Sequence, residues 1–225
     1  MSLNHSPAIV TDGLVLCLDA ANVRSYPKSG TTWTDLINQK QGTLSNGALY
    51  DADNSGSMLL DGTNDYISTN VNPVEISGTN YVFSLCVYFN ASAISTTSIF
   101  FGNVSGSGRY LIGLQSQSSN LYGYFNLNGI NNSGTSQSLM SLNTWNHFTL
   151  TYDDASIKSY VNGVLVETTS TSAVSFVSWN NMVIGQWTTG SQLMNGKIAS
   201  MLHYNRALTA DEVRQNYEAT VGRYT

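Results

Sequence analysis

The sequence contains few charged residues. Lys, Arg, Asp and Glu make up 10 % of its 225 residues, against about 25 % in an average soluble domain. The nine Lys and Arg residues form no cluster, and the formal net charge is −5 at pH 7. The chain therefore lacks the basic patch that binds a phosphate backbone, so we expect no nucleic-acid partner. A surface of neutral polar groups is better suited to sugars or to other proteins.

Long apolar runs and many cysteines are also missing. No stretch approaches the ~18 apolar residues of a membrane-spanning helix, so we expect no membrane insertion. The first residues, MSLNHSPAIVTDG, lack the basic start and the apolar segment of a signal peptide, so we expect no signal peptide in this chain. Cys17 and Cys86 each lie in a strand-like run. A disulfide between them is possible, but we predict two buried free thiols.

Alternation of apolar and polar residues dominates what is present. In residues 81–89 every second side chain is apolar or aromatic, which predicts a long central strand, and residues 147–152 alternate in the same way. Short strands of this kind follow one another between Gly and Asn turns, which favours an antiparallel sandwich over βαβ units. The sequence therefore predicts an all-β domain at residues 13–225, preceded by an N-terminal arm at residues 1–12.

One hairpin and one helix can be predicted in detail. Asn162-Gly163 lies between residues 157–161 and 164–168, and both turn residues tolerate the positive φ of a two-residue type I′ turn. That turn would place Val161 opposite Val164 and Lys158 opposite Glu167. Near the C-terminus, Thr209 and Glu212 have the spacing of a capping box. Val213, Tyr217 and Val221 follow along one side, so one short amphipathic helix ends the fold.

Several motifs, in their order along the chain, resemble a known family. They are GLVLCLDAAN at 13–22, LDGTNDYIST at 60–69, the Trp-x-His strand at 145–147 with its Asn-Gly hairpin, and NGKIASMLHYNRALTADEVRQNYEA at 195–219. Together they are similar to the LamG-like group of concanavalin A-like jelly rolls, although Leu60 stands where the family usually has Phe. The resemblance implies an antiparallel two-sheet jelly-roll sandwich with one short C-terminal helix.

The resemblance does not extend to catalysis. Members of the superfamily that cleave β-glucans carry an E-x-D-x-x-E strand, whose carboxylates act as nucleophile and acid. None of the four Glu residues here begins that motif, and H-E-x-x-H, G-x-S-x-G, P-loop and C-x-x-C motifs are also absent. His147 has no partner that the sequence identifies. We therefore expect a protein that is not an enzyme.

One predicted strand carries candidate ligand-binding residues. Sugars present an apolar face, which stacks on aromatic rings, and a rim of hydroxyl groups, which pairs with amides. Both kinds of side chain alternate along residues 121–128, with a further amide on the neighbouring strand and a Trp in a later turn. The alternative is a solvated or loop-covered sheet face without a ligand. The candidate residues are Gln115, Tyr122, Tyr124, Asn126, Asn128 and Trp187.

A calcium site is a second candidate. Many LamG-like relatives hold calcium at a loop rim through carboxylate and backbone oxygens, and Asp61, Asn64 and Asp65 cluster in a Gly-containing turn. The alternative is that an Asp in a tight turn bonds its own backbone N–H groups. Calcium is therefore a possible cofactor at these three residues.

These observations predict a non-catalytic, lectin-like binding module for a glycan or a cell surface, as part of a virion or an extracellular assembly. GLVLCLDAAN and SYPKSGTTW also resemble LamG-like segments of tailed-phage structural proteins. The alternative function is therefore a phage structural protein, for example a capsid decoration or a tail-associated part, whose jelly roll packs against other virion proteins. Both functions imply a location in the virion or outside the cell.

Overall fold

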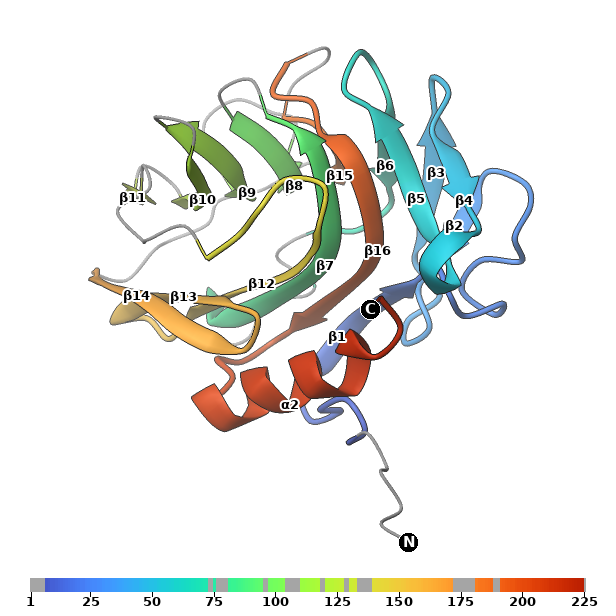
Figure 1. Cartoon of the computed structure of the whole chain (residues 1–225). Helices are drawn as coiled ribbons and strands as arrows, with labels where there is room; N and C mark the ends of the chain where they lie inside the picture. The colour runs from blue at the N-terminus through green and yellow to red at the C-terminus, as the bar shows by residue number, and fades with distance from the viewer. Residues whose placement is uncertain are drawn as a thin grey trace, which may run out of the picture.

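The computed structural model describes residues 7–72, 75, 81–94, 97–103, 110–117, 120–127, 130–132, 139–171, 181–187 and 191–224. Two antiparallel sheets are stacked face to face, and one helix lies against the outside of one of them (Figure 1). This confirms the predicted all-β sandwich with a C-terminal helix. Among the described residues, no helix is long and apolar enough to cross a membrane.

Sheet A contains eight strands in the order β14-β13-β12-β7-β16-β5-β4, with β1 also paired to β16. Its strands are β1 (Leu14–Asp19), β4 (Leu49–Asp51), β5 (Ser57–Asp61), β7 (Phe83–Ala93), β12 (Trp145–Tyr152), β13 (Ser156–Val161), β14 (Val164–Ser170) and β16 (Asn195–Tyr204). A 3₁₀ turn, η1 (Asp53–Ser55), lies between β4 and β5.

Sheet B also contains eight strands, in the order β11-β10-β9-β8-β15-β6-β3-β2. Its strands are β2 (Thr32–Thr34), β3 (Gln41–Ser45), β6 (Tyr66–Thr69), β8 (Thr97–Asn103), β9 (Tyr110–Gln117), β10 (Asn120–Leu127), β11 (Ile130–Asn132) and β15 (Met182–Ile184).

The core lies between the two sheets. Every second residue of β7, from Phe83 to Phe89, is completely buried there, as the alternation predicts. Burial of each such large side chain contributes roughly 1.5–3 kcal/mol. Gly123 of β10 also faces the core, where a Cβ atom would overlap the Phe148 ring of β12. The close approach of these two strands across the core therefore requires a residue without a side chain.

Helix α2 (Ala210–Val221) covers the outer face of sheet A. Thr209 and Glu212 form the predicted capping box, with the Glu212 N–H donating to Thr209 Oγ1 and the Thr209 N–H donating to Glu212 Oε2. Val213 packs against residues of β1, β7, β13 and β16. The buried side of the helix is centred on Val213, Asn216 and Thr220. It therefore differs from the predicted line of Val213, Tyr217 and Val221, because Asn216 has polar partners beneath the helix.

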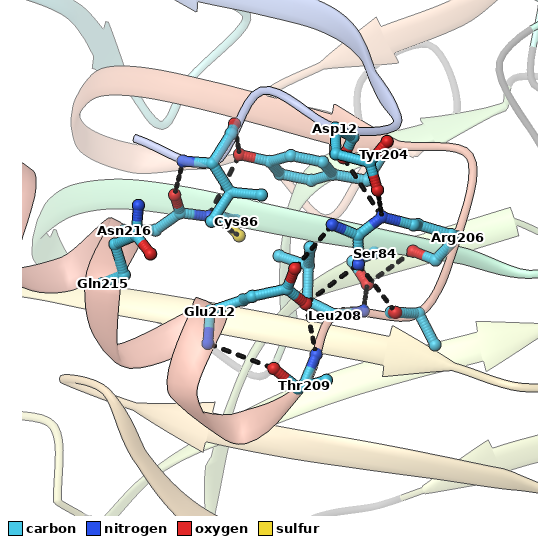
Figure 2. A network of polar contacts seen from close by, with 12 residues as sticks. Asp12, Ser84, Cys86, Tyr204, Arg206, Leu208, Thr209, Glu212, Gln215 and Asn216 are labelled. Atoms are coloured by element: carbon cyan, nitrogen blue, oxygen red, sulfur yellow. Dashed lines mark hydrogen bonds and ion pairs between the residues drawn. The ribbon is translucent and has the colours of Figure 1, made fainter. Parts of the chain in front are cut away.

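Those partners belong to a polar network that fixes the N-terminal segment to the helix (Figure 2). Asn216 accepts a hydrogen bond from the Val10 N–H at 2.9 Å and donates one to the Tyr204 hydroxyl at 3.0 Å. The Tyr204 hydroxyl in turn donates to the Val10 carbonyl. Arg206 forms a two-pronged ion pair with Glu212, at 2.6 and 2.9 Å, and reaches the Asp12 carboxylate at 2.9 Å. Part of the predicted arm, residues 8–12, is thus bonded to the domain, while its residues 1–6 lie outside the described residues.

The Asn162-Gly163 hairpin has the predicted turn, with φ of +50° and +79°. Val161 pairs with Val164 as predicted. A β-bulge between Ser159 and Tyr160 then shifts the register by one residue. The hairpin therefore matches its prediction only next to the turn.

The predicted pairing of Lys158 with Glu167 is wrong because of this bulge. Lys158 lies opposite Thr168. Its ammonium group contacts the Asp153 carboxylate at 3.3 Å instead.

The two cysteines are free and buried, as predicted. Cys17 of β1 and Cys86 of β7 both lie beside Leu202 of β16, one on each side. Two strand spacings separate them by about 10 Å, beyond the ~7 Å Cα limit of a disulfide. Burial raises the pKa of the Cys17 thiol to about 12 and that of Cys86 to about 11, so both thiols stay protonated.

Candidate functional site

The outer face of sheet B is on the side of the sandwich away from α2. Figure 1 shows the helix below β12, β7 and β16, with β8, β9 and β10 on the other side. On that outer face, Tyr122 of β10 lies directly opposite Gln115 of β9, which lies opposite Thr97 of β8. We call the surface formed by Thr97, Gln115, Tyr122 and Tyr124 the tyrosine face. Both tyrosines and Gln115 are half-buried, so their exposed parts are available to a ligand, whereas Thr97 is buried beside them.

Two glycines account for the shape of the tyrosine face. Gly123, pointing inward, lets β10 approach the core, and Gly113 lies opposite Tyr124 on the outside. A β-bulge in β8 brings the Ser98 carbonyl oxygen into the space that a Cβ atom of residue 113 would need. No side chain of β9 therefore stands between Tyr124 and Ile99 of β8.

Trp187 lies on the segment that continues sheet B beside β8. The Gly185 N–H donates to the Phe100 carbonyl, and the Ile99 N–H donates to the Gln192 carbonyl at 3.1 Å. Between these contacts the Trp187 N–H donates to the Ser191 carbonyl at 3.3 Å. The structure thus places the half-buried Trp187 beside β8, with β8 and β9 between its segment and the tyrosines of β10.

The asparagines of the predicted row differ from the tyrosines. Asn126 lies opposite Leu111 and is 3 % exposed, so its side chain belongs to the covered end of the sheet. Asn128 lies outside the described residues. The exposed part of the predicted row is therefore Tyr122 and Tyr124, with Gln115 beside them.

The chemistry of the tyrosine face is neutral. Its side chains offer two aromatic rings, phenol and threonine hydroxyls and one amide, and none of them is an acid or a base of the Asp, Glu, Lys, Arg or His type. Gln115 Oε1 is buried and has no hydrogen-bond partner among the described residues, so the exposed part of this side chain excludes that oxygen. This set of groups can stack on an apolar ring face and exchange hydrogen bonds with hydroxyl groups.

The predicted calcium residues lie in the turn between β5 and β6. Asp61 Oδ1 accepts hydrogen bonds from the N–H groups of Thr63 and Asn64, which lower the pKa of its carboxyl. Asp65 is 4 % exposed, and its Oδ2 accepts the Asp61 N–H at 3.1 Å. Burial raises the pKa of the Asp65 carboxyl. Its Oδ1 faces Gly47 and has no hydrogen-bond partner in the described part of the chain.

Calcium needs six to eight oxygen ligands. In this turn one oxygen of Asp65 is uncommitted, whereas one oxygen of Asp61 is already engaged by the backbone. Among the described residues, no group of three or more His, Cys, Asp or Glu side chains is placed to hold a metal. The residues thus fit a calcium ion only in part, and calcium at Asp61, Asn64 and Asp65 stays a prediction.

The structure also contains a hollow that sequence reasoning missed. It lies between the N-terminal segment, the end of β1 and the end of α2, with a volume of about 240 Å³, and a wider depression of about 490 Å³ adjoins it. Asp19, Asn22 and Arg223 line both, and Asp19 and Arg223 form an ion pair at 2.8 Å. No local pattern could have indicated this pair, because the two residues lie 204 positions apart.

Comparison with known proteins agrees with this architecture. Residues 61–214 match the family model that describes the Concanavalin A-like lectin/glucanases superfamily. No curated protein matches the chain by sequence.

Several solved structures share the fold at low sequence identity. The Trypanosoma rangeli sialidase in complex with the inhibitor DANA has a TM-score of 0.70 and 17 % identity, covering 99 % of this chain but only 36 % of the sialidase. Domain 4 of AbnA, a GH43 extracellular arabinanase from Geobacillus stearothermophilus in complex with arabinotriose, has a TM-score of 0.70 and 17 % identity, covering 91 % of this chain and 98 % of that domain. The receptor-binding domain of botulinum neurotoxin mosaic serotype C/D has a TM-score of 0.70 and 15 % identity, covering 93 % of this chain and 51 % of that one.

At these identities the structures establish the fold alone. The family model, by contrast, spans more than half of the chain, including the Asp61 turn, the Trp-x-His strand and the start of α2. The chain therefore belongs to the concanavalin A-like lectin/glucanase superfamily.

Proposed function

We propose that this protein binds glycans through the tyrosine face and does not cleave them. The observation that carries the proposal is the register of β9 and β10, which places the Tyr122 ring, the Tyr124 ring and the Gln115 amide side by side on a sheet face that α2 does not cover. The complex of AbnA domain 4 with arabinotriose supports it, since that domain has the same fold.

The binding mechanism follows from the spacing of the groups. Alternate residues of a strand are about 7 Å apart, so Tyr122 and Tyr124 present two rings in a row. The apolar faces of successive sugar units can stack on these rings. Hydroxyl groups at the sugar rim would bond the hydroxyls of the two tyrosines and the exposed part of the Gln115 side chain. Because the sheet is preformed by backbone hydrogen bonds, little ordering cost opposes binding.

The absence of bond cleavage belongs to the same proposal. Glycosidases place two carboxyl groups about 5–9.5 Å apart across the scissile bond. The tyrosine face contains no carboxyl group. His147, the one histidine of the Trp-x-His strand, lies on the other sheet beneath α2, where burial lowers its pKa to about 3. It is therefore not placed to exchange protons with a ligand on sheet B.

The test is a glycan array followed by isothermal titration with the oligosaccharides that bind, beginning with arabinotriose. Tyr122→Ala and Tyr124→Ala should each weaken binding by about fivefold, the equivalent of about 1 kcal/mol of stacking. Leu165→Ala is the matched control, because Leu165 is 47 % exposed on the other sheet. Equal affinities for all three variants, or no binding to any glycan at millimolar concentration, would refute the proposal. Release of reducing sugar by the protein would refute the non-catalytic part.

Packing against virion proteins is the second candidate, supported by the resemblance of GLVLCLDAAN and SYPKSGTTW to segments of tailed-phage structural proteins. It predicts that the protein is found by mass spectrometry in purified particles. Its absence from particles would remove this alternative and leave the glycan proposal unaffected.

A further inference from the structure

The distribution of charge differs sharply between the two sheets. Among the described residues, the eight strands of sheet B contain no Asp, Glu, Lys or Arg side chain at all. The strands of sheet A contain charges of both signs, namely Asp19, Asp51, Asp61, Lys158, Glu167 and Lys197. The neutral composition of the chain is thus concentrated in one layer.

The outer residues of sheet B are instead uncharged: they are hydroxyls, amides and aromatic rings, together with the buried aliphatic side chains of Ile99, Leu111 and Val183. Continuing from Val183 of β15, the cross-strand register places Ser68, Thr43 and Thr32 beside one another on β6, β3 and β2. The tyrosine face lies at the other end of the sheet, with the buried Val183 and Ile99 between the two ends. The hydroxyl and amide groups at both ends can exchange hydrogen bonds with a neutral partner, and none of these side chains can neutralise a charge.

Nearby charges do not alter this conclusion. Lys40 and Glu75 are close to the start of β3 but pair with each other at 2.6 Å. The Asp61–Asp65 turn precedes β6, which lies four strands from β10. Four strand spacings amount to about 19 Å, well beyond the Debye length of about 8 Å at physiological salt.

The sequence shows the same feature. Between residues 76 and 152 the only Asp, Glu, Lys or Arg is Arg109. It lies outside the described residues and precedes Tyr110, at the end of β9 away from Gln115.

An acidic sugar would dock on this face at a cost. Its carboxylate or sulfate loses hydration on contact with the sheet, and no cationic side chain is present to compensate it. A neutral sugar loses only hydroxyl hydration, which the Tyr and Gln groups replace. The tyrosine face therefore binds neutral sugars more tightly than acidic ones because it has no cationic side chain, since specificity is a difference between two affinities.

We propose that the tyrosine face of sheet B selects neutral glycans and rejects counterparts that carry a carboxylate, phosphate or sulfate on the contacted sugar units. This selectivity rests on the proposed glycan-binding function and names its ligand class.

The experiment is a glycan array on which neutral oligosaccharides stand beside their sialylated, sulfated and uronic-acid counterparts, for example lactose with sialyllactose and galactotriose with trigalacturonic acid. For each neutral glycan that binds, its acidic counterpart should bind at least about tenfold more weakly, a difference of about 1.4 kcal/mol. Titration of the neutral ligand at about 0.01 M and about 1 M salt, where the Debye length falls from about 30 Å to about 3 Å, should change its affinity less than about twofold.

Two variants sharpen the test. Gln115→Lys adds a cation beside the tyrosines and should give salt-dependent binding of the acidic counterparts. Arg109→Gln should leave the neutral preference unchanged, because the preference arises from the strands. Both variants should retain the wild-type melting temperature.

The outcomes separate the two proposals. Acidic glycans that bind as tightly as their neutral counterparts, or more tightly, would overturn the neutral selectivity while leaving glycan binding established. A loss of the preference in Arg109→Gln would overturn its assignment to sheet B. Absence of binding to every glycan on the array would overturn the proposed function itself.

Discussion

His147 should make the stability of the fold depend on pH from about pH 6.5 downward, so that the dependence begins above the range in which carboxylates titrate. The imidazole lies on the outer face of β12 beneath α2, with the Tyr88 and Tyr217 rings 5.6 and 5.9 Å from its own. It is 3 % exposed, and its Nδ1 has no hydrogen-bond partner in the part of the chain that the structure describes. Burial among these uncharged rings lowers its pKa from 6.5 to about 3.

The direction in which stability changes with pH follows from this depressed pKa. Between pH 6.5 and about 3 the unfolded chain binds a proton at His147 that the folded chain does not, so protonation favours unfolding. The stabilising contribution is complete above pH 6.5 and is lost as the pH falls toward 3. At pH 5 the loss is about 2 kcal/mol, and its upper limit is about 5 kcal/mol at 1.36 kcal/mol per pKa unit.

The assay is urea unfolding of the wild type and of His147→Phe at pH values between about 7.5 and 5. Phenylalanine keeps a ring between the tyrosines and removes the titrating group. The difference in unfolding free energy between the two proteins should shift by about 2 kcal/mol in favour of the variant over this interval. Glu212, whose pKa the Arg206 ion pair lowers to about 2, loses its contribution only below the unfolded value of 4.5, and does so equally in both proteins. Parallel pH profiles for the two proteins would refute the reasoning.

Three further predictions concern the fold and the turn before β6. Gly123→Ala should lower the unfolding free energy by about 1–3 kcal/mol, because the new methyl group meets the Phe148 ring. Gly222→Ala is its control: a Cβ atom there has no neighbour within 4 Å, so the unfolding free energy in the same urea titration should barely change. Glu212→Gln should cost about 1–2 kcal/mol through the weakened capping box and ion pair. Its control Glu218→Gln, 3.8 Å from Arg214 on the exposed side, should cost under about 0.5 kcal/mol, and equal losses would contradict the role of the cap. Calcium at the Asp65 turn would raise the melting temperature in millimolar CaCl₂ relative to EGTA. At a hundredfold excess of calcium over Kd the stabilisation would be about 2.7 kcal/mol, and Asp65→Asn should abolish it. An unchanged wild-type melting temperature would remove this prediction.

Local patterns were sufficient for the elements of the fold. Alternation identified the inward side of β7, the Asn162-Gly163 pair identified its hairpin, and the spacing of Thr209 and Glu212 identified the start of α2. Each of these features depends on residues close together in the sequence. The bulge opposite Ser159, where Val166 of β14 is the unpaired extra residue, has no signal in the hairpin sequence.

The candidate site was only partly predictable, for a related reason. His147, Thr149 and Thr151 alternate along β12 just as polar residues do along β10, yet α2 covers them and they are buried. The sequence of neither strand indicates which of the two α2 will cover. The exposure of Tyr122 and the burial of Asn126 likewise depend on contacts made by distant parts of the chain.

The described residues nearest the two termini, Pro7 and Tyr224, lie on one side of the sandwich, which sets how this module can be displayed. Ala8 and Val10 bond α2, and Tyr224 stacks on Tyr88 and packs at a tilt against Trp145 at the outside of sheet A. A tether at either end, whether a biosensor surface or a neighbouring domain, would leave from that side. The tyrosines of β10 would then lie on the side of the sandwich opposite the tether.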